Sequence, residues 1–198
     1  MATLSSAKTL GGVGSILLLL GAAPSVGFAL AIAGFVMVLV AVKYISDLLT
    51  DKSIFNNMLI AVILGIIGVA TAGLLVVGSV LRFIGLGYTN FGPGSVSTAI
   101  PTDVVGLLVA LVLGLIVAWV FLLVSSVFLR RSFTTIANRL GVGMFSTAGL
   151  LFLIGAALAI IIIGFALIFV AEILMIVAFF SLPDQVPGMQ TPAPMPSG

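Results

Sequence analysis

The chain alternates between long apolar segments and short gaps that hold most of its charges. The hydrocarbon core of a bilayer takes about 20 apolar residues per helix, and lipid offers the backbone no hydrogen-bond partner. The pattern therefore predicts an all-α fold, a polytopic transmembrane bundle of about six helices within residues 1–182. We expect these helices over residues 7–22, 26–48, 54–81, 104–129, 142–158 and 159–182. The Pro-rich tail, residues 183–198, is expected to be disordered.

Two of the joints between these segments are very short. The first contains Pro24, which breaks helices and favours a tight hairpin. The second, around residues 156–159, has neither proline nor a polar residue, so a single kinked helix of about 40 residues is the alternative. At ~1.5 Å per residue that helix would reach about 60 Å, twice the hydrocarbon core. We therefore predict two helices.

The first and last hairpins resemble each other. Ser15–Ala23 aligns with Gly149–Ala157, and Gly27–Leu30 aligns with Gly164–Leu167 after three extra residues in the second copy. Internal duplication is common in membrane bundles. The alternative is chance similarity, because a sequence rich in Leu, Gly and Ala aligns easily with itself.

The charges predict an orientation. With six crossings, six of the seven basic residues fall on one side and only Arg82 on the other. Cytoplasmic loops carry the excess of Lys and Arg, so we expect a multi-pass protein of the cell (cytoplasmic) membrane with both termini in the cytoplasm. The competing interpretation of the N-terminus is a secretory signal peptide, and the repeat argues against it.

Two loops add detail to this topology. Leu129, Phe133, Ile136 and Leu140 recur at helical spacing, which predicts a short helix lying in the interface near anionic headgroups. The basic residues expected to face headgroups and anchor the orientation are Lys43, Lys52, Arg130, Arg131 and Arg139. The outer loop, residues 84–102, is rich in glycine and proline and is expected to cover the mouth of the bundle.

Composition then limits the chemistry. The chain is 62% hydrophobic and 6% charged, whereas soluble domains carry about 25% charged residues. It has no cysteine and no histidine, which removes thiolate catalysis, the usual metal ligands and the commonest general base. We therefore expect no enzyme, no catalytic residues, no metal and no cofactor. No dense basic patch points to nucleic acid; the expected partners are the lipid bilayer and either another membrane protein or a second copy.

Glu172 is the candidate polar site. It stands near the centre of the last apolar segment, where an ionised carboxylate costs a few kcal/mol. Two interpretations stay open: a proton or cation site, and a protonated acid that hydrogen-bonds across helices. The candidate hydrogen-bond partners are Thr71, Ser125, Ser126 and Thr147.

Three stretches carry a resemblance to a known family. They are Leu4-Ser5-Ser6-Ala7-Lys8-Thr9-Leu10-Gly11-Gly12, Asp51-Lys52-Ser53-Ile54-Phe55-Asn56-Asn57 and Ala178-Phe179-Phe180-Ser181-Leu182-Pro183. The chain resembles, over residues 4–183, an uncharacterised and mainly archaeal family of small integral membrane proteins, a domain of unknown function. The resemblance implies a multi-helix membrane protein and supplies no activity or site residues. It also implies an aromatic residue where Glu172 stands, which argues against a family-wide role for this carboxyl.

The leading hypothesis is a membrane protein that acts by packing or interaction, as an accessory subunit or a membrane-organising protein. The second is a small channel or carrier with Glu172 in its path. An enzyme ranks third, because no nucleophile–base pair or metal-ligand set can be assembled from these residues.

Overall fold

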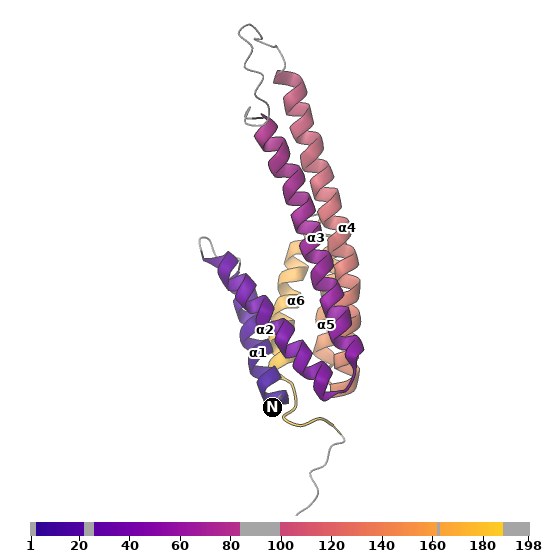
Figure 1. The fold of residues 1–198 in the computed structure, drawn as a ribbon. Coiled ribbons are helices and arrows are strands. Elements are labelled where there is room, and N and C mark those ends of the chain that lie inside the picture. Colours follow the sequence, from indigo (N-terminus) through magenta and orange to yellow (C-terminus); the bar gives the residue numbers. More distant parts are fainter. Residues whose placement is uncertain (1–2, 22–25, 84–99, 162, 188–198) are drawn as a thin grey trace, which may run out of the picture. The chain divides into compact units, whose positions relative to one another are not determined.

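A computed structural model describes residues 3–21, 26–83, 100–161 and 163–187 of the chain. The described residues form helices and turns without a strand, so the all-α prediction is confirmed (Figure 1). The helices are α1 (Leu4–Leu20), α2 (Gly27–Leu48), α3 (Lys52–Phe83), α4 (Ile100–Leu140), α5 (Gly143–Ala157) and α6 (Ile163–Phe180). By length and composition α2, α3, α4 and α6 can each cross a membrane, whereas α1 and α5 are shorter apolar helices of 17 and 15 residues.

The chain divides into two compact units, which we describe separately. The first consists of Met1–Ala61 and Ser126–Gly198, and the second of Val62–Ser125. In the first unit α1 packs against both α2 and α6, and α5 packs against α6. The described residues of the second unit are the continuations of α3 and α4, which contact each other where Gly68 meets Phe121 and Gly114 meets Val76.

The last two apolar segments are separate helices, as predicted. α5 ends at Ala157 and α6 begins at Ile163, with turn residues between them. The alternative of one long kinked helix is therefore wrong.

The fourth helix is longer than predicted. It continues past residue 129 to Leu140, because residues 115–140 contain no glycine or proline, and it ends where Gly141 adopts a φ of 71°. Phe133, Ile136 and Leu140 are buried in the core of the first unit. The predicted separate helix in the interface is thus wrong, since this apolar face packs against protein.

Three aromatic rings lie at the centre of that core. Phe145 of α5 packs edge-to-face against Phe133 of α4, with ring centroids 5.6 Å apart, and against Phe179 of α6 at 5.0 Å. All three side chains are almost fully buried. Such pairs contribute about 0.5–1.5 kcal/mol beyond the area they bury, so they join α4, α5 and α6 in a defined register.

The burial pattern supports the predicted repeat. In the register that aligns Gly27 with Gly164, seven described positions of α2 are buried, and six of their counterparts in α6 and just beyond its end are buried as well. The exception is Ser46, whose counterpart Pro183 is only partly buried. The six buried pairs are Gly27 and Gly164, Gly34 and Ala171, Val38 and Met175, Ala41 and Ala178, Val42 and Phe179, and Ile45 and Leu182. The shared positions favour a duplication over chance similarity, which stays the alternative.

Aligned glycines also make matching contacts in the two hairpins. A Cβ on Gly27 would overlap the carbonyl oxygen of Gly21, and a Cβ on Gly164 would overlap that of Gly155. The second helix of each hairpin therefore begins against the backbone at the end of the first. Such close approach requires residues without side chains.

Parts of three predictions lie outside the described residues: the joint at Pro24, residues 84–99 of the outer loop, and residues 188–198 of the tail. The start of the tail differs from the prediction of disorder. Val186 packs against the core, and the Asp184 carboxylate lies 3.7 Å from the Lys8 ammonium.

The glycine contact gives a first testable prediction. In Gly155→Ala the new methyl would lie 2.9 Å from the Gly164 carbonyl oxygen and 3.0 Å from the Ile168 amide nitrogen, both backbone atoms. We expect a loss of about 1–3 kcal/mol, the usual cost of overpacking, measured as a lower apparent Tm in detergent. Gly143→Ala in the same helix is the control, because its methyl would meet nothing within 4 Å. Equal stability of the two variants would contradict the proposed contact.

Candidate functional site

A cavity of about 160 Å³ lies in the first unit, where its helices converge. Every one of the six helices contributes to its wall. One lining residue from each helix, in chain order, is Leu18, Val38, Met58, Phe133, Phe152 and Met175. Among the described residues that form it, the wall is apolar except at one position, and that position is Glu172 of α6.

Glu172 is partly buried in this wall. Within its unit no hydrogen bond or ion pair joins its carboxyl to another described residue. Thr147 instead donates to the Gly143 carbonyl of its own helix at 3.4 Å. Ser126 is buried in α4, whereas Thr71 and Ser125 belong to the second unit. The predicted hydrogen bond from Thr147 to Glu172 is therefore not formed.

The size and chemistry of the cavity limit what it can hold. A dry apolar cavity of about 150 Å³ accommodates one benzene ring, so this one has room for a group of that size. A carboxyl in an apolar wall favours an occupant that donates a hydrogen bond or brings a positive charge. The described residues contain no group of three or more His, Cys, Asp or Glu side chains able to hold a metal.

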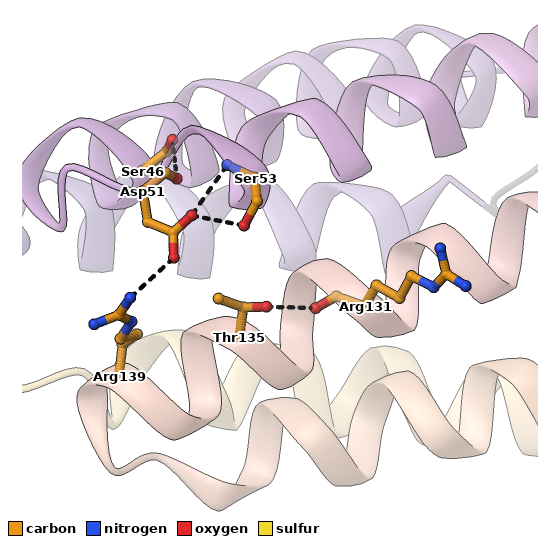
Figure 2. A network of polar contacts seen from close by, with 6 residues as sticks. All are labelled: Ser46, Asp51, Ser53, Arg131, Thr135 and Arg139. Atoms are coloured by element: carbon orange, nitrogen blue, oxygen red, sulfur yellow. Dashed lines mark hydrogen bonds and ion pairs between the residues drawn. The ribbon is translucent and has the colours of Figure 1, made fainter.

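A second polar constellation lies at the turn between α2 and α3 (Figure 2). One oxygen of the Asp51 carboxylate accepts hydrogen bonds from the Ser53 hydroxyl at 2.6 Å and the Ser53 amide at 3.1 Å. The other oxygen lies 3.4 Å from the Arg139 guanidinium near the end of α4. Ser46 donates to the Asp51 carbonyl at 2.8 Å. Asp51 thus caps the first turn of α3 and joins it to α4.

The environment of Asp51 lowers its pKa below the ordinary 3.8. The largest cause is the hydrogen bond from the Ser53 hydroxyl; the Ser53 amide and the Arg139 guanidinium act in the same direction, against partial burial. The carboxylate is the form that these donors stabilise. Asp51 has no role in the sequence-based prediction, although an Asp directly before the start of a helix is a capping signal.

The predicted headgroup-facing residues have different surroundings. Lys43, Lys52 and Arg130 are exposed. Arg131 lies over the Phe128 ring, 5.5 Å from its centroid, and Arg139 is engaged by Asp51. Contact of these side chains with headgroups stays a prediction.

At the N-terminus a further basic residue joins the two ends of the bundle. The Lys8 ammonium donates to the Leu182 carbonyl at 3.2 Å and lies near Asp184. The start of α1 therefore lies beside the end of α6. A surface ion pair adds little stability, because ordering its side chains costs conformational entropy.

Fold and composition together define the class: an integral membrane protein built as a helical bundle. Residues 30–173 match the family described as a protein of unknown function, DUF996. The uncharacterized protein MJ1644 of Methanocaldococcus jannaschii is 38% identical over 184 residues, covering 92% of this chain and 95% of that protein. The chain belongs to the DUF996 family, and the predicted resemblance is confirmed. No solved structure matches.

The Asp51 cap gives a second prediction. Asp51→Ala should lower stability by about 0.5–2 kcal/mol, the usual effect of removing such a cap, measured by thermal unfolding in detergent near neutral pH. Asp47→Ala is the control, because Asp47 is exposed on the preceding helix and its carboxyl makes no hydrogen bond to a described residue.

The same cap predicts a pH dependence. Because the pKa of Asp51 is lower in the folded state, its charge stabilises the fold above pH 3.8, and this contribution is lost as the pH falls through the folded value. The stability difference between the protein and Asp51→Asn should therefore shrink when the pH is lowered below about 4. A difference that grows on acidification would contradict the assignment.

Proposed function

We propose that the protein acts by packing and interaction within the membrane, as an accessory subunit or a membrane-organising protein. The supporting observation is the surface of the second unit. Its helices carry no charged residue between Val62 and Leu81 or between Val104 and Ser125. Val69 and Leu74 on α3 expose about three-quarters of their surface, at 73% and 75%. Lipid or another membrane helix must cover these side chains.

Three glycines of this unit favour a protein partner. A Cβ on Gly73, Gly78 or Gly106 would meet nothing within 4 Å, so the backbone is open there. In lipid, helices associate by close packing, and small residues at the surface allow a second helix to approach. We propose a membrane-protein partner, or a second copy of the chain, at this surface. No catalysis is assigned to it.

The partner gives a third prediction. Purification under mild detergent should recover a membrane protein in stoichiometric amount, or a dimer of the chain. Replacing both Gly73 and Gly78 by Leu should reduce that recovery by about tenfold or more, which is ~1.4 kcal/mol of association energy. Undiminished recovery in the folded double variant would count against the proposed surface.

The control for this variant is the same substitution at a packed glycine of the second unit. A Cβ on Gly114 would lie 3.2 Å from the Val76 side chain and 3.4 Å from the Ala72 carbonyl oxygen. Gly114→Leu should therefore lower the stability of the α3–α4 pair, whereas the change at Gly73 and Gly78 should leave the Tm of the isolated chain close to that of the unchanged protein.

We further propose that the protein lies in the cell membrane with six crossings and both termini in the cytoplasm. The contact of Lys8 with Leu182 supports a common side for the two ends. The excess of Lys and Arg in the loops supports the cytoplasm as that side.

Cysteine labelling tests this topology. Because the chain has no native cysteine, only the introduced residue reacts. Asn138→Cys stands at an exposed position near Arg139 and should react with an impermeant maleimide only after the cells are permeabilised. Ser97→Cys, in the outer loop of the predicted topology, should react in intact cells. Labelling of Asn138→Cys from outside would refute the orientation.

A small channel or carrier is the second candidate function. The observation that favours it is the placement of Glu172, the only charged side chain among the described residues that line the cavity, where the helices of the first unit converge. Reconstitution in liposomes with proton- and cation-sensitive dyes tests it: transport would require flux that Glu172→Gln abolishes. Absence of flux in the unchanged protein would leave the interaction role as the better explanation.

A further inference from the structure

Both repeated hairpins line the cavity together with α3 and α4, and each hairpin contributes repeat-related residues. The register of the repeat pairs Leu18 with Phe152, Val38 with Met175, and Phe35 with Glu172, and all six residues belong to the wall. Two of these pairs join one apolar side chain to another. The third joins a phenylalanine to a carboxyl. Three repeat-related pairs therefore line this cavity, which we call the chamber, and the one polar group that the described residues place in its wall stands at only one of the two equivalent positions.

The chamber offers Glu172 no compensating charge from the part of the chain that the structure describes. No Lys or Arg of that part lines the wall, and within its unit the carboxyl has no hydrogen-bond partner among the described residues. Burying a carboxyl without a partner is costly, and the repeat shows that an aromatic ring fits the equivalent position. An occupant that supplied the missing positive charge would turn this unfavourable group into a favourable contact.

We propose that the cavity binds a small lipophilic amine, with its hydrocarbon part between the two hairpins and its ammonium group against the Glu172 carboxyl. The volume of about 160 Å³ accommodates one ring of about six carbon atoms. Apolar residues such as Leu18, Phe152 and Met175 surround that ring. The single carboxyl makes binding selective for the charged form over a neutral molecule of the same shape.

Binding of an amine is independent of the interaction role and does not require transport. Binding requires only the chamber and its carboxyl, whereas transport also requires a path to both sides of the membrane. If no partner or no flux is found, the proposal of amine binding is unaffected. If no amine binds, the proposed interaction surface on the second unit is unaffected.

The experiment uses the full chain in detergent, with cyclohexylamine and the neutral cyclohexanol as probes. Ligand-observed NMR measures the affinity of each, and the shift of Tm gives a second readout. The amine should bind at least about tenfold more tightly than the alcohol. Glu172→Gln, which keeps the shape of the side chain, should remove this preference while cyclohexanol binding persists.

Two further variants separate the chamber from adsorption to the micelle. Ala171→Leu adds bulk to the wall beside Glu172 and should abolish binding of both probes. Moving the carboxyl to the repeat-related position, in Glu172→Gln combined with Phe35→Glu, should restore the preference for the amine. Equal affinity of the unchanged protein for both probes, an undiminished preference in Glu172→Gln, or no binding of either probe would overturn the proposal.

Discussion

The constraint on which the structure depends is that lipid cannot hydrogen-bond to the backbone. It explains why the described segments are helical, and also how the buried hydroxyls are arranged. Ser15 donates to the Gly11 carbonyl, Ser46 to the Asp51 carbonyl and Ser132 to the Ile54 carbonyl, at 2.7–2.8 Å. No buried side-chain nitrogen or oxygen among the described residues lacks a partner. Among the described residues, backbone carbonyls thus accept from three of the four buried serines, whereas the carboxyl of the partly buried Glu172 has no such partner within its unit.

Where nearly every side chain is apolar, hydrophobic contrast cannot select which helices pair, and shape must do so. The repeat uses the same device twice, a glycine at the start of the second helix against the backbone at the end of the first. The copies differ at the centre of the core. The register that aligns Ser15 with Gly149 pairs Gly11 with Phe145. Gly11 leaves room for the Phe179 ring, and Phe145 packs edge-to-face against it.

The two units differ in their chemistry. The first contains the aromatic core, the Asp51 cap and the chamber with its single carboxyl. The second presents apolar side chains and open glycines on α3 and α4. The proposed interaction surface and the proposed ligand site therefore share no residues. The first depends on uncovered apolar area, and the second depends on a cavity with one polar group among its described lining residues.

The sequence by itself determined the all-α class and the number of helices, because these follow from the length of the apolar segments between charges relative to the thickness of a bilayer. Its composition also determined that few side chains are able to act as catalysts or metal ligands. The length argument that separated α5 from α6 reached the right result, yet it would have forbidden α4, whose 41 residues form one helix. The length of a helix does not decide where it ends. α4 ends just before Gly141, and α5 ends where Gly164 at the start of α6 packs against its backbone. Only the tertiary structure decided that Arg139 meets Asp51, that the face of Phe133 is internal, and that Glu172 borders a chamber shared by two repeats. Those outcomes depend on which helices become neighbours, and that choice rests on shape complementarity between residues far apart in the chain.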